Sequence, residues 1–259
     1  MGRVRSRQTV ESALSMSDDG VPDRVNAELH GVALRTIRTW RRRYQLEGRV
    51  RIDGPGTPCP RCDGAALDEA AYALLLGWYL GDGHIVAARR GVYTLQIAND
   101  QKYPELNQEI AATIRRVKPT ASPCLRGGSG AVRIEARWKH WPCLFPQHGP
   151  GRKHLRRIVL HEWQQELVRR EPELLLRGLF HSDGCRFVNW TTKRLASGGE
   201  RRYEYIRYMF HNESADILSI LTDALDQVGV PWRRPRSNVV AVSRREGVAA
   251  LDRFVGPKR

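Results

Sequence analysis

Cysteine, lysine and long hydrophobic runs are all scarce in this chain of 259 residues. Five cysteines, an odd number, do not suit a secreted disulfide scaffold and indicate a reducing, cytoplasmic environment. The longest nearly apolar stretch, residues 70–80, is far shorter than the roughly 20 residues that cross a bilayer. The first residues lack the apolar core of a secretory signal peptide. We therefore expect neither a secreted disulfide-rich domain nor a protein with membrane-spanning helices.

Acidic residues are also in short supply. The chain has 28 Asp and Glu against 43 Lys and Arg, a net charge of +15, and only six of the basic residues are lysines. A hydrophobic fraction of 41% can form a core, so wholesale disorder is not expected. Because arginine is always charged and its planar group matches phosphate, nucleic acid is the first candidate partner. High-GC codon usage is the alternative source of the arginine excess.

The pattern of residues divides the chain into four segments. Residues 1–50 have helical patterns and an arginine cluster, and residues 51–68 are dense in proline and glycine, as in a linker. Residues 69–160 and 161–259 form an internal repeat. In each copy an apolar helix ends at Asp-Gly, and strand-like alternation, a second helix and a further strand follow. We therefore expect a small helical domain followed by a duplicated α+β domain.

The two copies of the repeat align without gaps at an offset of 101 residues. Residues 75–83 read Leu-Leu-Gly-Trp-Tyr-Leu-Gly-Asp-Gly, and residues 176–184 read Leu-Arg-Gly-Leu-Phe-His-Ser-Asp-Gly. Small residues recur four positions apart in both, at Gly77 and Gly81 and at Gly178 and Ser182. Glycine costs a helix about 1 kcal/mol relative to alanine, so these positions suggest close packing of two helices. The obvious partner of each helix is the other copy.

Such packing would bring Asp82 and Asp183 together at the carboxyl ends of the two helices. The carboxylates would repel each other and the negative ends of the helix dipoles. A divalent cation would relieve this repulsion, and oxygen ligands with room for water and phosphate suit Mg²⁺. This arrangement is typical of metal-assisted phosphodiester hydrolysis. Gly83 and Gly184 are expected to end the helices in left-handed geometry, and the alternative is a pair of ordinary Asp-Gly turns.

The double motif resembles that of the LAGLIDADG, or dodecapeptide, homing endonucleases, over about residues 69–259. The resemblance implies a pseudo-twofold αββαββα pair in one chain, with the motif helices at the centre and two antiparallel sheets forming a saddle over DNA. It also implies that Asp82 and Asp183 are catalytic metal ligands. Family members usually place a lysine near the centre, for which Lys139 is our candidate, with Lys193 and Arg244 as alternatives. The family's earlier acidic or polar motif position is filled here by Leu80 and His181.

The resemblance also assigns the sheet residues that would contact DNA. Alternation along the strands directs one set of side chains to the DNA-facing side of each sheet. These residues are Thr94, Gln96, Arg133, Glu135, Arg137, Tyr205 and Arg207. The same fold serves sporulation regulators that bind DNA without cutting it, but those typically lack the acidic pair that this chain keeps.

Residues 21–43 resemble a helix-turn-helix. Gly31 permits the turn, while Ile37 and Trp40 lie one helical turn apart and would bury the second helix. The polar side chains left for bases and phosphates are Arg35, Thr36, Arg38, Thr39, Arg41, Arg42 and Arg43. The alternative interpretation is an amphipathic hairpin with a solvated basic face.

Cys59 and Cys62 form a Cys-Pro-Arg-Cys knuckle that suits a structural Zn²⁺ ion. A tetrahedral site needs two more ligands, and Cys143, His148 and His154 are candidates, although nothing in the sequence brings them near. The alternative is reduced, unliganded thiols in a linker.

These observations lead to one leading hypothesis. We expect a freestanding, monomeric LAGLIDADG-type endonuclease that cleaves double-stranded DNA, needs no obligate protein partner, and is cytoplasmic and associated with the nucleoid. The helix-turn-helix would add affinity by tethering the nuclease to DNA. A DNA-binding transcriptional regulator that does not cleave is the alternative, and a general RNA-binding protein is a weaker third.

Overall fold

The computed structural model describes residues 7–47, 58–128, 130–196 and 198–259. The chain divides into two compact units, Met1–Pro58 and Cys59–Arg259. Residues 51–57, the first part of the expected linker, lie outside the described residues. The remainder of that segment is not a linker, because residues 59–68 belong to the second unit and Cys59 is completely buried there.

Within residues 7–47, the first unit contains three helices, α1 (Arg7–Asp18), α2 (Asp23–Leu29) and α3 (Leu34–Glu47). Ala13, Ala27 and Ile37 form its small core, and Trp40 packs against the edge of that core. Asn26 is buried and donates a hydrogen bond of 2.7 Å to the carbonyl of Ala13, which ties α2 to α1. Gly31 has a φ of +57° between α2 and α3, a conformation that glycine adopts without strain. The helix, turn, helix order expected from the sequence is therefore present.

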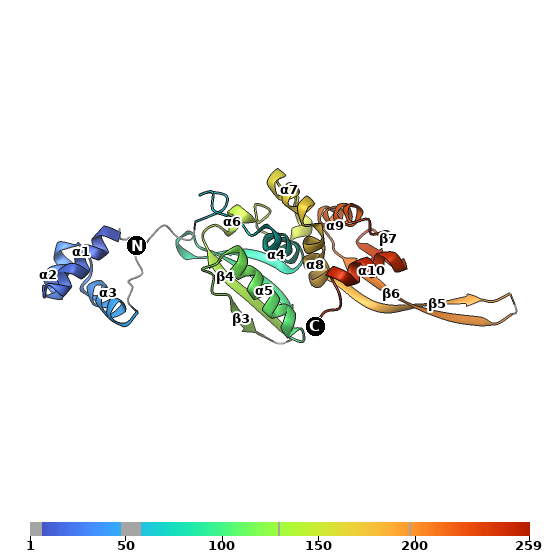
Figure 1. Ribbon diagram of the computed structural model, residues 1–259, viewed down its shortest axis with the longest axis horizontal. Helices are drawn as coiled ribbons and strands as arrows, with labels where there is room; N and C mark the ends of the chain where they lie inside the picture. Colours follow the sequence, from blue (N-terminus) through green and yellow to red (C-terminus); the bar gives the residue numbers. More distant parts are fainter. Residues whose placement is uncertain (1–6, 48–57, 129, 197) are drawn as a thin grey trace. The chain divides into compact units, whose positions relative to one another are not determined.

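The second unit contains two copies of one arrangement, as expected (Figure 1). The first copy contains α4 (Glu69–Asp82), β1 (Gly83–Ala87), β2 (Tyr93–Asp100), α5 (Pro104–Val117), β3 (Cys124–Gly127), β4 (Ala131–Trp138) and the short α6 (Trp141–Leu144). The second contains α7 (Glu162–Arg170), α8 (Pro172–Asp183), β5 (Gly184–Arg194), β6 (Glu200–His211), α9 (Ala215–Gln227), β7 (Arg233–Arg236), β8 (Val239–Val242) and α10 (Arg245–Phe254). Single 3₁₀ turns occur at Arg89–Gly91 and Lys153–Leu155.

Each copy forms a four-stranded antiparallel sheet with the same strand order. The orders are β1-β2-β4-β3 and β5-β6-β8-β7, so the fourth strand in sequence lies between the second and the third. The register is also shared, since Gly83 pairs with Ile97 and Gly184 pairs with Phe210. The duplicated αββαββ architecture is therefore confirmed by the topology of the chain itself.

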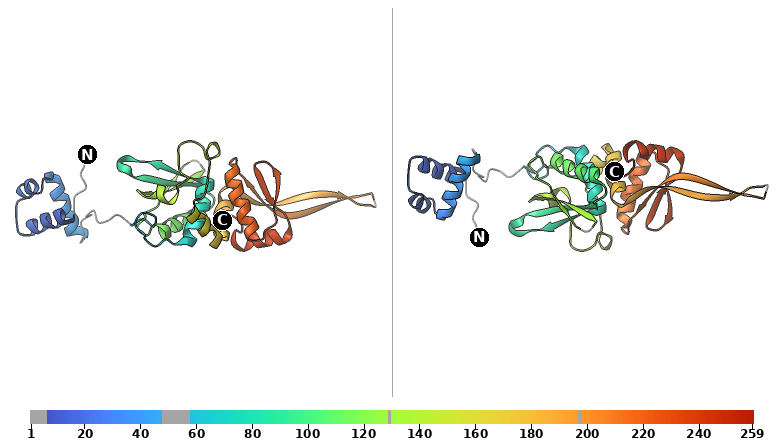
Figure 2. Two further views of the ribbon diagram at one scale, coloured as in Figure 1. Left: turned by 90° about the horizontal axis from the view of Figure 1, so that it is seen from above. Right: turned by 90° about the horizontal axis from the view of Figure 1, so that it is seen from below.

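The core lies around the two motif helices, which run between the sheets (Figure 2). Residues 71–80 of α4 are all buried, because a helix that is apolar on every side is stable only when it is surrounded by protein. Leu95, Ile97 and Ile134 point inward from the first sheet and are completely buried. This packing fixes the carboxyl ends of α4 and α8 within the molecule and thereby positions the residues that follow.

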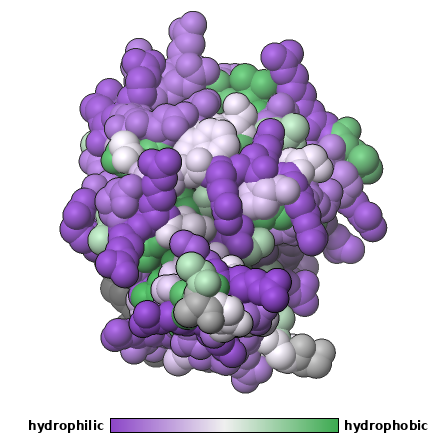
Figure 3. All heavy atoms as spheres, turned by 90° about the vertical axis from the view of Figure 1, so that its right-hand side faces the viewer, coloured by the Kyte–Doolittle hydropathy of each residue, from purple (hydrophilic) through white to green (hydrophobic). Residues whose placement is uncertain are grey.

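The hairpin of β5 and β6 extends well beyond its sheet (Figure 1). Only Tyr208–His211 of β6 pair with β8, so the outer residues of the hairpin pair with each other alone. Trp190 is 56% exposed on this arm, and the guanidinium of Arg202 lies 4.9 Å from its ring centroid. The surface seen from the arm's end is mostly hydrophilic, with hydrophobic residues in small patches (Figure 3). No helix in the described ranges is both long and apolar enough to cross a membrane.

Candidate active site at the ends of the motif helices

The two motif helices touch backbone to backbone at Gly77 and Gly178. A Cβ atom on Gly77 would lie 2.8 Å from the nitrogen of Leu179 and 2.9 Å from the Cα of Gly178. A Cβ atom on Gly178 would meet the nitrogen of Trp78 and the Cα of Gly77 at the same two distances. These reciprocal contacts reflect the pseudo-twofold relation of the copies. Glycine is needed at both positions because any side chain would push the helices apart.

Glycine follows each aspartate because the backbone passes close to the preceding helical turn, and not because it adopts a left-handed conformation. Gly83 has a φ of −92° and Gly184 a φ of −99°, so the expected left-handed helix ends are wrong. A Cβ atom on Gly83 would instead lie 2.5 Å from the Cα of Tyr79, and one on Gly184 would lie 2.8 Å from the Cα of Phe180. The chain turns directly from helix into strand there, which leaves no room for a side chain.

Asp82 and Asp183 end α4 and α8 on the same side of this helix pair. Burial and the nearby Asp183 carboxylate raise the pKa of Asp82 to about 6. Burial also raises the pKa of Asp183, although a 2.6 Å hydrogen bond donated by the Asn212 amide opposes this. The two carboxylates therefore share a partly desolvated space in which both negative charges are unfavourable. Such a pair suits a divalent cation.

Lys153 is the first of two lysines at this junction. Its ammonium group donates hydrogen bonds to the carbonyls of Leu80 at 3.0 Å and Gly81 at 2.7 Å, and also to that of Tyr79. A cation at this position is favourable because the carbonyls at a helix carboxyl end carry partial negative charge. Burial lowers the pKa of Lys153 to about 8, while the carboxylates of both aspartates oppose the decrease.

Lys258 occupies the corresponding place on the second helix. Its ammonium group donates a 3.0 Å hydrogen bond to the carbonyl of Ser182 at the end of α8. Burial lowers its pKa, and the Asp82 and Asp183 carboxylates act in the opposite direction. The tail that carries Lys258 is held by Arg177, which donates to the carbonyls of Phe254 and Val255, both at 2.9 Å. Each helix end is thus paired with a lysine from a loop or tail of its own half.

Lys139 does not take this central place, contrary to the expectation from the sequence. Gly83, at the end of α4, pairs with Ile97, which in turn pairs with Ile134 on β4. Lys139 is exposed and five residues further along, which corresponds to roughly 16 Å of strand. Arg244 is exposed at the start of α10 and Lys193 lies near the outer end of β5, so neither alternative is brought to the helix ends.

A spacing signal could have identified the two lysines. Lys153 and Lys258 are 105 residues apart, close to the 101 residues that separate Asp82 from Asp183. The two copies are not identical around the site, however. Asn212 donates to Asp183, whereas the equivalent Asn99 donates instead to Asn107, at 2.9 Å. Of the two carboxylates, only that of Asp183 receives an amide hydrogen bond of this kind among the described residues.

The open face of the first sheet is basic, and some of its polar side chains hydrogen-bond to one another. Arg133 and Arg137 are exposed on this face, as predicted. Gln96 donates a 3.0 Å hydrogen bond to Glu135, and Arg126 donates one of 3.1 Å to the same carboxylate. Thr94, by contrast, is only 7% exposed, so its expected accessibility to DNA is wrong.

The second sheet presents Tyr205 and Arg207 on the side opposite its core. Tyr208 and Phe210 of the same strand point inward and pack against Phe180, and strand alternation directs Tyr205 and Arg207 outward. Asn189 donates a hydrogen bond to the Tyr205 hydroxyl across the hairpin. Within the described part of the chain, the Nε of Arg207 is buried without a hydrogen-bond partner.

In the first unit, intramolecular contacts occupy some of the candidate DNA-binding residues. Arg38 and Arg41 pair with Asp23, at 3.5 Å and 2.8 Å. The Thr39 hydroxyl donates back to the carbonyl of Arg35. The remaining predicted residues have different environments: the side chains of Arg35 and Arg42 are exposed, Thr36 is half-buried, and the side chain of Arg43 lies outside the described part of the structure.

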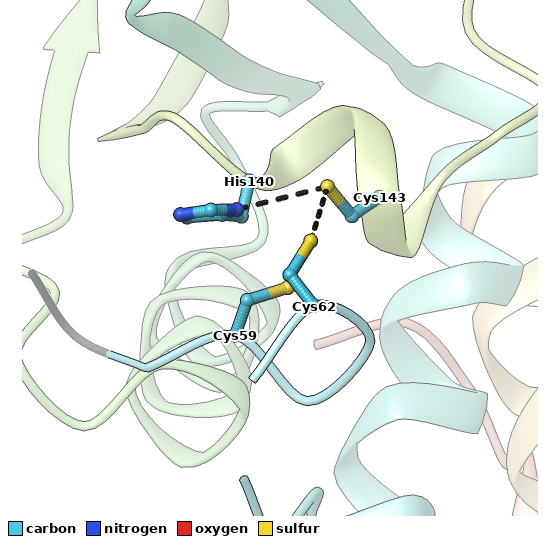
Figure 4. Close-up of side chains that lie close together, drawn as sticks. All are labelled: Cys59, Cys62, His140 and Cys143. Carbon is cyan, nitrogen blue, oxygen red and sulfur yellow. Dashed lines mark hydrogen bonds between the residues drawn. The ribbon is translucent and has the colours of Figure 1, made fainter. Parts of the chain in front are cut away.

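Cys59 and Cys62 meet two further side chains of the second unit. Cys143 is one of them, as the sequence allowed, and the other is His140, which was not anticipated (Figure 4). The other two candidates are elsewhere, since His148 packs edge-on against Tyr93 and His154 is exposed. His140 immediately precedes α6, and a helical turn places it beside Cys143.

No family model and no curated protein matches the sequence. Among solved structures, the chain is similar to I-DmoI in complex with DNA and Ca, with 18% identity, a TM-score of 0.47, and coverage of 72% of this chain and 89% of that one. It is also similar to the LAGLIDADG meganuclease I-AabMI bound to uncleaved DNA, with 14% identity, a TM-score of 0.44 and coverage of 71% and 83%. The LAGLIDADG homing endonuclease I-SmaMI bound to cleaved DNA gives 10% identity, a TM-score of 0.44 and coverage of 72% and 83%.

Proposed function

We propose that this protein is a site-specific, metal-dependent endonuclease of LAGLIDADG type that cleaves double-stranded DNA as a monomer. The observation that carries the proposal is the pair of half-buried aspartates, Asp82 and Asp183, at the adjoining ends of two duplicated helices, each with a lysine beside it. An ordinary pair of Asp-Gly turns would not require two partly desolvated carboxylates close enough for the charge of Asp183 to raise the pKa of Asp82. Action on DNA would place the protein with the nucleoid in the cytoplasm.

The donor set fits a hard divalent cation. Asp82 and Asp183 supply oxygen ligands, and the repulsion that raises the pKa of Asp82 to about 6 would be relieved by a bound cation. We assign Mg²⁺ to this site. When bound, such an ion stabilises negative charge at the scissile phosphate and activates water. Asn212 orients the Asp183 carboxylate through its 2.6 Å hydrogen bond.

The two lysines supply positive charge that does not depend on the metal. Lys153 and Lys258 are held by helix-end carbonyls, so their ammonium groups are fixed before DNA arrives. Fixed charges stabilise developing negative charge without reorganisation during the reaction. The equivalent placement of the two lysines provides one for each half of the site, and each would serve the cleavage of one strand.

The remaining basic surfaces would bind the DNA backbone and bases. Arg133 and Arg137 from the first sheet, with Tyr205 and Arg207 from the second, lie on the sides of their sheets away from the helical core. In the first unit, the exposed Arg35 and Arg42 of α3 are available to phosphate. Because the first unit is a separate compact unit, it would act as a tether that raises the local concentration of the nuclease at DNA.

Cleavage of a randomised duplex pool in the presence of Mg²⁺, with sequencing of the ends, tests the proposal. The wild type should produce double-strand breaks at a limited set of related sequences. Asp82→Asn and Asp183→Asn should abolish cleavage and retain binding, whereas Asp223→Asn, which changes an exposed carboxylate on α9, should cleave normally. Specific binding with no cleavage by the wild type would refute the nuclease and favour the regulator.

A further inference from the structure

A second group of ligand-type side chains lies apart from the aspartates, in the first half of the second unit. Cys59, Cys62, His140 and Cys143 each direct one ligand atom inward, and these atoms all lie within 4.8 Å of one another (Figure 4). The first two come from the loop that begins the unit, and the other two are His140, directly before α6, and Cys143 within it. Two segments distant in sequence therefore converge on one point.

The distances match a tetrahedral metal site. Zinc lies about 2.3 Å from sulfur and about 2.0–2.1 Å from imidazole nitrogen, so two ligands of one ion are separated by roughly 3.5–3.8 Å. The sulfurs of Cys62 and Cys143 are 3.4 Å apart, and the Cys143 sulfur lies 3.7 Å from Nδ1 of His140. A disulfide would instead require the sulfurs to be about 2.05 Å apart.

We propose that Cys59, Cys62, His140 and Cys143 bind one structural Zn²⁺ ion. Three thiolates and one imidazole complete a tetrahedral shell, which leaves no open position for water or substrate, and this is the mark of a structural site. The site is chemically distinct from the aspartate pair, because soft sulfur ligands select zinc whereas carboxylates suit magnesium. The proposal does not depend on whether the protein cleaves DNA.

The position of the site indicates what the ion would stabilise. Trp141 and Leu144 of α6 are completely buried, and the Leu144 carbonyl accepts a hydrogen bond from Tyr72 of the motif helix. Arg61, between the two knuckle cysteines, lies 4.5 Å from the ring centroid of Trp163. Zinc would therefore fasten the beginning of the second unit to α6 and, through α6, to the core around α4.

Metal analysis of the full chain, purified without chelators, tests this proposal. We expect one zinc ion per wild-type chain, its loss in Cys143→Ser and His140→Ala, and its retention in His140→Cys, which offers a four-cysteine shell. The matched controls are Cys124→Ser, an exposed thiol outside the cluster, and His148→Gln. Both controls should retain the ion. A wild type without stoichiometric zinc, or a Cys143→Ser variant that keeps it fully, would overturn the proposal.

Thiol titration of the wild type covers the case in which the ligand variants do not fold. Two of the five cysteines should react readily, and the three thiolate ligands should become reactive only after a strong chelator is added. The melting temperature should decrease in parallel and recover when Zn²⁺ is restored. Full reactivity of all five thiols before chelation, or two thiols that stay unreactive until a reductant is added, would refute zinc in favour of free thiols or a disulfide.

Discussion

Replacing Gly77 with alanine tests whether the motif helices really touch through their backbones. Alanine is favoured over glycine in a helix by about 1 kcal/mol, so helix propensity alone predicts a more stable protein. The new Cβ atom, however, would lie 2.8 Å from the Leu179 nitrogen and 2.9 Å from the Gly178 Cα, and closer still to the Leu175 carbonyl oxygen. These are backbone atoms, which cannot rotate out of the way as a side chain could.

The size of the destabilisation expected for Gly77→Ala follows from how far the two helices must move apart. Ordinary contact requires the Cβ to be at least 3.4 Å from its neighbours, so the helices must move apart by roughly 0.5–1 Å, a gap that forfeits a quarter to a half of the dispersion energy across it. Overpacking of this kind costs about 1–3 kcal/mol. The lost packing contacts of the separated helices add about 2 kcal/mol, and helix propensity returns about 1 kcal/mol, so we expect a net destabilisation of about 2–4 kcal/mol.

The assay is thermal unfolding of the second unit, with the cleavage rate measured in parallel. For a domain of this size the expected decrease in melting temperature is roughly 5–15 °C. The control is Gly127→Ala, at which an added Cβ meets no atom within 4 Å and the backbone φ is ordinary. It should change stability by less than about 1 kcal/mol.

Two outcomes would refute the reasoning. One is a Gly77→Ala variant that is as stable as the wild type or more stable, since helix propensity would then be the dominant effect. The other concerns the double variant with Gly178→Ala. Once the first Cβ has separated the helices, the second fits partly in the same gap. The double variant should therefore lose less stability than the sum of the losses in the two single variants. Fully additive losses would indicate that the two glycines do not face each other.

Three further predictions concern the site and its partners. Lys153→Met should reduce the cleavage rate at least 100-fold while changing DNA affinity only a few-fold, because it removes a fixed charge beside both aspartates; Lys139→Met should cleave normally, and equal losses in the two variants would contradict the placement. Asp82→Asn should raise the stability of the metal-free protein by up to about 3 kcal/mol above pH 7. The pKa of Asp82 is about 6 in the folded protein, against 3.8 for an unperturbed aspartate. The wild type is therefore most stable when this group is protonated, and it loses that stability as the pH rises through 6. The gain should therefore shrink between pH 6 and pH 4 in unfolding experiments with a chelator, and a pH-independent gain would argue against a raised pKa. Deleting residues 1–58 should weaken DNA binding across all sequences and lower its dependence on salt, with little change in the cleavage rate at saturating protein, whereas a changed sequence preference would show that this unit reads bases.

Much of the fold was predictable because it depends on local patterns. Short stretches of sequence show the duplicated Asp-Gly motif and the small residues four positions apart. They also show the helical and strand periods of the hydrophobic residues. These stretches correctly indicated two packed helices and two similar halves. The strands β1 and β5 were not separately identified, because they begin directly at Gly83 and Gly184 and their side chains do not alternate cleanly. The geometry of these two glycines was also misjudged, since close approach to a neighbouring turn leaves no local signal.

The partners of the site residues were much less predictable. Lys153 lies in a loop and Lys258 in the tail, and neither segment has a periodic pattern that would direct a side chain. Lys139 was preferred because it ends a strand, yet the register of that strand places it far along the sheet. Similarly, alternation assigned Thr94 to the open face but could not show that its side chain is nearly buried there.

The sequence by itself determined the repeat, the two aspartates and the basic character of the chain, since each is a property of residue type and spacing. Only the tertiary structure decided which distant groups meet: Lys153 and Lys258 at the ends of the motif helices, and His140 with the cysteines. The physical reason is that helix and strand periodicity arises from interactions over a few residues. Contacts between loops depend instead on how whole helices and sheets pack, and this chain fixes that packing through the close contact of Gly77 with Gly178.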